Sequence, residues 1–449
     1  MRRGTSIIVG LLARAVLLPF FSHPFDVYLW HKMFVSILQN VAAVESFPPM
    51  IWYVFLPFAY VYEWLYKFCH TEVTPVAALP KDLSLPLSAW GVQYVPDMPF
   101  IVIVKIPFVV SDILLAVVVY LLVKETTTDP KHADLALKLW FLNPFVIWIS
   151  SGWGLFDTLP TLFAMASLLE LHRKRVRRSA IYLAVSVGFK LFAILFLIPI
   201  LLYFLKTRSH ARHICIQYAA TFTLASLVIF LPAARWVPHF VRLFLYASEY
   251  PGVPVSVGRG LTYWSFALAY EVDATAASVV SMLLVFISVA MVYAMASKTS
   301  SAESTLWLMP VCLSSLATVF LTYRVINEQY FVWIVPLLAV LVARKHVSRV
   351  FFYALTIVAM AYSLANCVAP FCMLPLSAWI PDFLVLLLRM VQPWRIRTSE
   401  PSDPRYLPAP VFGSLLLAAL GTSFSILLAV LVWRLLFKQR VERSQGSPS

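Results

Sequence analysis

The stretch that decides the fold is residues 181–205, which read IYLAVSVGFKLFAILFLIPILLYFL. It is longer than the about 20 residues that a helix needs to cross a bilayer. Basic clusters flank it on both sides, His172–Arg178 before it and Lys206–Arg212 after it. Such clusters mark the cytosolic side of a membrane. Two cytosolic ends require an even number of crossings, so the stretch is predicted to be a broken hairpin that turns near Lys190. The alternative is a single crossing in which one flank violates the charge rule.

The composition of the whole chain agrees with a membrane as its solvent. Hydrophobic residues make up 61% of the 449 residues and charged residues 12%. The apolar runs are long and do not alternate as barrel strands do, so helices are the expected spanning elements. We expect an all-α, polytopic transmembrane helical bundle of about 10 to 13 membrane helices, some of them short, broken or interfacial. Residues 1–449 would form a single domain, with a cytosolic tail over residues 438–449.

The formal net charge of +14 does not indicate nucleic acid as a partner. Most basic residues lie in short loops beside apolar segments, where they report orientation. The cytosolic face is predicted to carry residues 172–178, 206–212, 344–349 and 434–443. The opposite face, cell exterior or organelle lumen, would carry residues 23–99, 153–158, 233–273, 323–329 and about 370–408.

Residues 23–99 form a long first outer loop that is dense in aromatic side chains between residues 50 and 66. Trp and Tyr are enriched where a membrane meets water. Residues 50–66 are therefore predicted to be an interfacial or re-entrant helix, with a true span as the alternative.

Two carboxylates are predicted to reach this outer face. Asp26 follows an apolar run over residues 7–21, and Asp157 ends the polar stretch Ser150–Asp157. An acid at membrane depth is expensive unless it does chemistry or binds a charged group. For Asp157 the alternative is a purely local role as the N-cap of the next helix.

Two polar stretches could bind a phosphate or hydroxyl groups. Arg259 lies between two glycines, which suits a bidentate phosphate contact; a plain flexible loop is the alternative. A short connector between two tight helices carries Arg324, Asn327, Glu328 and Gln329. The alternative for the connector is a turn whose polar groups only face water.

Outward carboxylates beside cations at lipid depth suit a substrate that is itself half lipid, namely a sugar on a polyprenyl phosphate. Asp26 would act as the base on an acceptor hydroxyl, which is worth about 10²–10⁴-fold in rate. Lys190, with Arg259 or Arg324, would hold the phosphate. Asp157, Asn327, Glu328 and Gln329 complete the predicted substrate-binding residues.

The ordered motifs of the chain resemble those of the C-type glycosyltransferases, most closely the mannosyltransferases that include the first enzyme of GPI-anchor assembly and prokaryotic relatives. The motifs are Asp26–Trp30, Lys105–Tyr120, Leu142–Pro144 with Ser150, Ser151 and Asp157, Gly188–Leu191 with Pro199, and Asn327–Trp333. The resemblance implies an inverting transferase that moves a sugar, typically mannose, from a dolichyl or polyprenyl monophosphate on the non-cytosolic face. The acceptor would be a lipid-linked or other glycan, in contact with membrane lipids, and a small membrane subunit could accompany the chain.

The chain departs from this pattern at one position. Eukaryotic members carry an Asp-x-Asp pair in the first loop, whereas Pro24 stands at the earlier position here. A metal held by that pair is therefore not predicted to be required, although a divalent metal remains an alternative. The same departure favours a cell membrane, with the endoplasmic reticulum membrane as the alternative. Asp112, within a helix, is expected to be mainly structural.

Two other classes of protein stay open. A transporter would place ionisable groups near the midplane and show an internal repeat, whereas these acids gather on the outer face. A catalytically silent relative would resemble the GPI transamidase subunit of this general architecture, which serves as a binding scaffold. The presence of both Asp26 and Asp157 favours an active enzyme.

Overall fold

The computed structural model describes residues 3–39, 48–66, 95, 97–207, 211–236, 274–298, 307–323, 326–366, 372–377 and 411–438. These residues form helices and, within the described ranges, no strand, so the predicted all-α bundle is confirmed. Arg259, Arg324 and most of the predicted outer loops lie outside the described residues.

Five of the described helices are long and apolar enough to cross a membrane. They are α1 (Arg3–Phe20), α5 (Met98–Thr126) and the apolar parts of α11 (Ala211–Phe230), α14 (Ala274–Lys298) and α20 (Val411–Trp433). A bent pair over residues 130–153 makes a sixth, and four shorter apolar helices accompany them. The described residues thus contain five or six helices that could span a membrane, and the larger predicted number of membrane helices stays a prediction.

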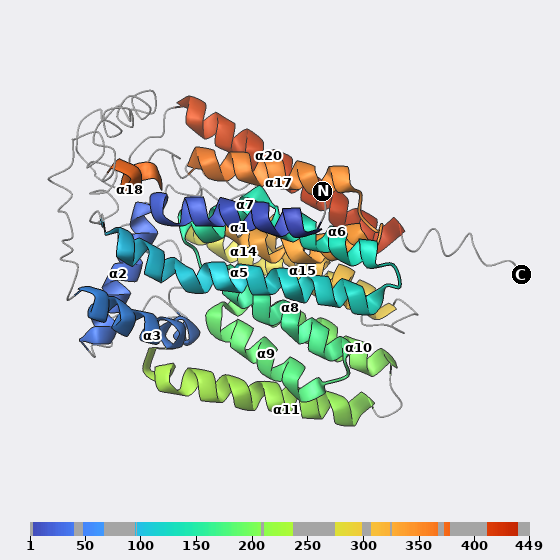
Figure 1. The fold of residues 1–449 in the computed structure, drawn as a ribbon. Coiled ribbons are helices and arrows are strands. Elements are labelled where there is room, and N and C mark those ends of the chain that lie inside the picture. The colour runs from blue at the N-terminus through green and yellow to red at the C-terminus, as the bar shows by residue number, and fades with distance from the viewer. Residues whose placement is uncertain are drawn as a thin grey trace, which may run out of the picture.

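The helices run alongside one another as a bundle (Figure 1). Helix α5 contacts α1, α6 (Pro130–Phe141) and α8 (Thr158–His172), and α8 packs on α9 (Val176–Phe189), which in turn packs on α11. On the other side α17 (Arg349–Asn366) packs on α20. Short helices α2 (Pro24–Leu38), α3 (Pro49–Tyr66) and α18 (Leu374–Ser377) gather at one end of the bundle, on the left in Figure 1.

The core is centred on α16 (Val335–Ala343), whose nine residues are all buried. It contacts α5, α6 and α15 (Leu308–Thr322). A helix that is apolar on every side is buried by its neighbours rather than by one face. Helix α16 therefore holds together the two sides of the bundle.

The chain reverses its direction at Lys190. Helix α9 ends at Phe189, Lys190 is extended, and the 3-10 helix η3 (Leu191–Phe196) leads into α10 (Leu197–Thr207). The Ser179 hydroxyl near the start of α9 lies 3.5 Å from the Tyr218 hydroxyl in the first half of α11. Because α9 and α11 start at the same end, α10 has to run back toward that end, as Figure 1 shows. The structure thus has the predicted hairpin and not the single crossing.

A second break separates α6 from α7 (Pro144–Ile147) and the π-helix η2 (Trp148–Trp153), and the chain bends there by 46°. The Asn143 Oδ1 atom accepts from the Phe145 and Val146 backbone N–H groups, at 3.0 and 3.3 Å. Asn is a favoured N-cap and Pro144 a favoured first helical residue. The Asn-Pro pair therefore ends one short helix and starts the next.

Residues 50–66 do form a helix, α3, which packs on α2 and α5. It is not among the five helices that are long and apolar enough to span. Its Tyr60 and Trp64 side chains are exposed. The placement of α3 in the membrane interface remains a prediction.

Candidate active site

Asp26 lies in the first turn of α2, at the end of the bundle where α2 and α3 gather. Its Oδ2 atom accepts a hydrogen bond from Trp153 Nε1 at 2.6 Å. The same oxygen lies 2.8 Å from His23 Nδ1. The Asp26 side chain keeps 17% of its surface exposed. One carboxylate oxygen is thus fixed, and Oδ1 makes no hydrogen bond within the described residues.

His23 stacks on the Trp153 ring, with ring centroids 4.7 Å apart. It lies in the turn between α1 and α2, outside the spanning helices. Burial alone would lower the pKa of His23, but the contact with Asp26 and its charge outweigh burial, with smaller contributions from Cys372 and Glu328. The pKa of His23 is therefore raised above its ordinary value.

Lys105 fixes the π-helix that carries Trp153. Its ammonium, buried on α5, donates to the backbone carbonyls of Ser151 and Gly152 at 3.0 and 3.1 Å. It also donates to the carbonyls of Leu18, at 3.2 Å, and Phe21, at the end of α1. A cation is stabilised at the carbonyl end of a helix, and here one ammonium serves two such ends.

The end of the π-helix and the turn that follows it are held by hydrogen bonds to the carbonyls of Trp153 and Gly154. The Trp153 carbonyl accepts from the His23 backbone N–H at 3.1 Å, and the Gly154 carbonyl from Trp30 Nε1 at 3.1 Å. Gly154 has a φ of +89°, which favours glycine, and a Cβ there would lie 2.8 Å from Lys105 Cε. Together with the Lys105 contacts, every carbonyl from Ser151 to Gly154 is bonded. Trp153 is therefore held in place beside Asp26.

Asp157 is fully buried and forms an ion pair with Lys190, 2.5 Å from Oδ1 to Nζ. Trp333 Nε1 donates to the same oxygen at 3.1 Å. Asp157 precedes α8, but its side chain makes no capping hydrogen bond. The alternative of a purely capping role is therefore wrong. Its Oδ2 atom is buried and has no hydrogen-bond partner within the described ranges.

Lys190 sits among aromatic rings as well as against Asp157. Its Nζ lies 4.2 Å from the centroid of the Tyr330 ring and 4.8 Å from that of Phe156. Asp26 also attracts this ammonium. The two carboxylates predicted from sequence therefore act on one lysine, and Asp157 already balances its charge.

The 3-10 helix η8 (Glu328–Trp333) closes the site. It supplies Trp333 to Asp157 and Tyr330 to Lys190. Glu328 is buried and its charge acts on His23, whereas Asn327 and Gln329 are half-buried. The predicted connector is thus part of the same site and not only a turn that faces water. Arg259 and Arg324 are not placed, because neither is among the described residues.

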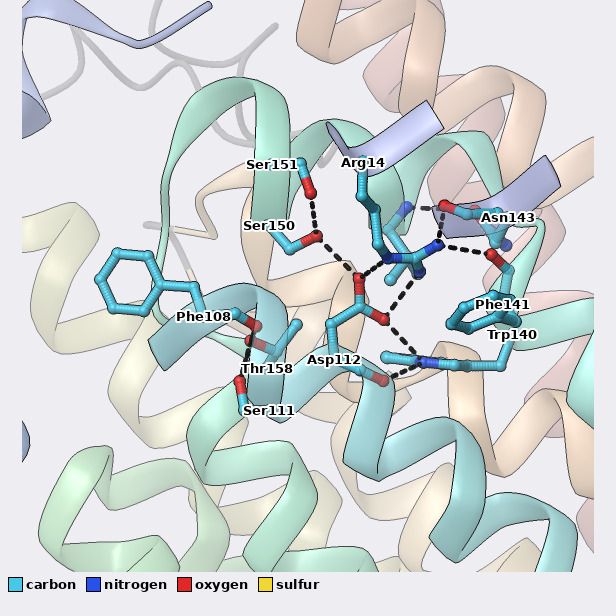
Figure 2. Close-up of polar contacts among 12 residues, drawn as sticks. Arg14, Phe108, Ser111, Asp112, Trp140, Phe141, Asn143, Ser150, Ser151 and Thr158 are labelled. Atoms are coloured by element: carbon cyan, nitrogen blue, oxygen red, sulfur yellow. Dashed lines mark hydrogen bonds and ion pairs between the residues drawn. The ribbon is translucent and has the colours of Figure 1, made fainter. Parts of the chain in front are cut away.

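A second buried ion pair, between Arg14 and Asp112, contacts the π-helix through Ser150 (Figure 2). Arg14 Nε and Nη2 contact the two Asp112 oxygens at 2.7 and 2.9 Å, and both side chains are almost fully buried. Asp112 also accepts from Trp140 Nε1 at 2.9 Å and from Ser150 Oγ at 2.8 Å. This network links α1, α5, α6 and η2, which agrees with the expected structural role of Asp112.

Sequence reasoning assigned no role to Arg14, His23, Trp153 or Trp333. A charged residue inside an apolar helix is a signal in itself, and it could have singled out Arg14 in the first apolar run. The two tryptophans carry no such signal, because aromatic residues are common throughout this chain.

Metal binding is not evident in the part of the chain that the structure describes. No group of three or more His, Cys, Asp or Glu side chains there is placed to hold an ion. The site as described can orient a carboxylate, offer a second carboxylate oxygen and present one ammonium.

Comparison with known proteins gives one family match and two fungal relatives. Residues 83–247 match the family model described as GPI transamidase subunit PIG-U, which is less than half of the chain. GPI mannosyltransferase 1 of Candida albicans is 36% identical over 107 residues, covering 23% of this chain and 26% of the relative. GPI mannosyltransferase 1 of Kluyveromyces lactis is 29% identical over 146 residues, covering 32% and 34%.

The chain therefore matches only about a quarter to a third of the length of these curated relatives. The matches support a relation to glycosyltransferases of the C-type without singling out one member. They also agree with an integral membrane protein with several spans.

Proposed function

We propose that this chain is an inverting glycosyltransferase that moves a sugar, expected to be mannose, from a polyprenyl or dolichyl monophosphate to an acceptor hydroxyl. The site would lie on the non-cytosolic face of the membrane. The cell membrane is the favoured location, and the endoplasmic reticulum membrane is the alternative. The names of the fungal relatives support the choice of mannose.

One observation carries the proposal: the Asp26 carboxylate is fixed through one oxygen and leaves the other without a hydrogen bond in the described structure. An acceptor hydroxyl bound at Oδ1 would give its proton to Asp26. Its oxygen would then bond to the anomeric carbon as the bond from that carbon to the phosphate oxygen breaks. The electron pair of the broken bond leaves with the lipid phosphate, and the configuration at the carbon inverts.

Lys190 would stabilise the departing phosphate, and such electrostatic help is often the largest single contribution to catalysis. Its ammonium is already paired with Asp157, so the pair is neutral before the donor binds. A dianionic or monoanionic phosphate would therefore draw on a further cation, and Arg259 or Arg324 is proposed for this role. The proposed mechanism requires no metal ion.

The sugar would lie against the second carboxylate. Asp157 Oδ2 is a buried acceptor without a partner in the described structure, and a sugar hydroxyl is a suitable donor to it. Asn327, Glu328 and Gln329 lie on the adjoining helix η8 and its N-cap. We assign them to the sugar or to the acceptor.

A silent scaffold is the second candidate, favoured by the match of residues 83–247 to the transamidase-subunit family model. That match includes Asp112, Asp157 and Lys190, but it begins after Asp26 and so does not include it. A scaffold could use the Asp157 and Lys190 pair to bind a lipid-linked glycan without any need for a base. The two candidates therefore differ in what Asp26 does.

The test is transfer of radiolabelled mannose from a polyprenyl-phosphate donor to a membrane lipid extract, in detergent that contains a chelator. Purified wild type is compared with Asp26→Asn and with the control Asp134→Asn, whose carboxylate lies 3.8 Å from Arg3 near the surface. Transfer by wild type and Asp134→Asn, but not by Asp26→Asn, is the expected result. Donor binding without transfer by the wild type would favour the scaffold.

A further inference from the structure

Among the residues that the structure describes, His23 is the titratable side chain that touches the proposed base. Its Nδ1 atom lies 2.8 Å from Asp26 Oδ2, and its ring stacks on Trp153, which donates to the same oxygen. The His23 backbone N–H donates to the Trp153 carbonyl. Two separate contacts therefore tie His23 to Trp153, and a third ties it to Asp26.

This arrangement is asymmetric about the Asp26 carboxylate. Both contacts, from His23 and from Trp153, fall on Oδ2, and the described residues give Oδ1 no hydrogen bond. The group that fixes a base through one oxygen decides where the other oxygen points. His23 is only 8% exposed, so its ring has little freedom to leave.

We infer that His23 is a positioning residue that holds Asp26 for proton abstraction and permits transfer only while its own ring is neutral. This inference rests on the proposed function. A neutral ring keeps its Nδ1 atom 2.8 Å from Asp26 Oδ2 and leaves the negative charge of the carboxylate available to the acceptor. A second proton on the ring gives an imidazolium, which holds the carboxylate in an ion pair and makes it a less effective proton acceptor.

The groups that face His23 favour its charged form. Asp26 comes from α2, Glu328 from η8 and the Cys372 thiol from the turn before α18. Burial of the His23 ring opposes them. The nearby Lys105 side chain is bonded to the carbonyl of Phe21, two residues before His23. The raised pKa of His23 agrees with this balance and places its change of charge above the ordinary value for histidine, near the working pH of most enzymes.

The expected consequence is an acid limb in the pH profile of transfer. Below the pKa of His23, kcat/KM should fall about tenfold for each pH unit. His23→Gln keeps a polar side chain near Asp26 but cannot take a charge, so the acid limb should disappear. Trp153→Phe keeps the ring under His23 and removes only the donor, so it should lower kcat and leave the limb in place.

The control is His31→Gln, which removes a half-buried histidine of α2 whose ring contacts that of Phe100. It should leave both the limb and the rate unchanged. A limb that persists in His23→Gln while the wild type transfers mannose would overturn the inference and leave the proposed function intact. No transfer by the wild type at any pH would overturn the proposed function, and the role of His23 with it.

A second measurement does not depend on activity. The pKa of His23 can be read from NMR of the protein with ¹³C-labelled histidine, with the His23 signal assigned by its loss in His23→Gln. Asp26→Asn should lower this pKa, because it removes the nearest negative charge, and Asp134→Asn should not move it. An unchanged pKa in Asp26→Asn would overturn the contact on which the inference depends, even if the His23→Gln protein folded but transferred no mannose.

Discussion

Replacing Asp112 with an apolar residue should strongly lower the free energy of unfolding, because it leaves a buried charge without its partner. In Asp112→Leu, Arg14 keeps its charge with 2% of its side chain exposed and loses both contacts at 2.7 and 2.9 Å. Its remaining acceptors are the carbonyls of Gly10 and Phe141. Breaking a buried ion pair from one side costs about 3–5 kcal/mol, so we expect a loss of that size in the free energy of unfolding.

The double variant Arg14→Met with Asp112→Leu separates charge from packing. It removes both charges and fills the space with apolar atoms, and such replacements are often close to neutral. Trp140 Nε1 keeps the Asp112 backbone carbonyl as an acceptor, at 3.0 Å. The double variant should therefore be more stable than Asp112→Leu alone by about 2 kcal/mol or more.

The assay is reversible unfolding in mixed micelles by titration with sodium dodecyl sulfate, followed by tryptophan fluorescence. All variants are measured at one pH and one lipid-to-detergent ratio. The reasoning would be refuted if Asp112→Leu lowered the free energy of unfolding by less than about 1 kcal/mol. It would also be refuted if the loss in the double variant equalled the sum of the losses in Asp112→Leu and in Arg14→Met alone, within about 0.5 kcal/mol.

Three further predictions concern two close approaches at glycines and the ion pair between Asp157 and Lys190. Gly154→Ala should lower the free energy of unfolding by about 1–2 kcal/mol in the same titration, because its φ is +89° and the new Cβ would meet Lys105 Cε at 2.8 Å. Gly10→Ala should be destabilising because its Cβ would lie 2.5 Å from the Phe141 ring, whereas Gly4→Ala, with nothing within 4 Å, should change stability by less than about 0.5 kcal/mol. Lys190→Met should raise the KM for the lipid donor in the transfer assay. The control is Lys206→Met, which removes an ammonium that binds the Ala296 carbonyl and should leave the KM unchanged. Equal KM values for Lys190→Met and the wild type would show that Lys190 does not hold the phosphate.

The sequence was sufficient for the parts of the fold that follow from local composition and charge. Long apolar runs predicted membrane helices because each helix bonds its own backbone in lipid. The turn at Lys190 was predicted because basic clusters on both flanks of one apolar stretch leave only an even number of crossings. Neither argument needs to know which helix packs on which.

For the candidate site, the sequence predicted several of the residues but not the contacts between them. Asp157 was expected at the outer surface and Lys190 close to the outer half of the membrane. Their ion pair joins residues 33 positions apart and was not foreseen. The Trp333 contact with Asp157 spans 176 positions, and the Arg14 contact with Asp112 spans 98. Contacts at such separations leave no periodic pattern in a single sequence, so only the packed structure shows them.

Lys105 sets an order for the assembly of this protein during synthesis. Two of its carbonyl partners, on Leu18 and Phe21, precede it in the chain, and two, on Ser151 and Gly152, follow it. When α5 leaves the ribosome, half of the acceptors for its ammonium do not yet exist. A lysine at the very centre of a membrane helix costs about 2.5–3.5 kcal/mol on insertion scales. Lys105 lies nearer the start of α5, so its cost is smaller, and the apolar residues of α5 can offset it.

Helix α5 can therefore enter the bilayer early, beside α1, with its charge only half satisfied. The π-helix that carries Trp153 completes the set of acceptors when it arrives. A nascent chain that stops before residue 148 would contain the early helices but lack the π-helix whose Trp153 orients Asp26. The proposed catalytic carboxylate thus gains its geometry late in biosynthesis, after the helix α2 that bears it has already been synthesised.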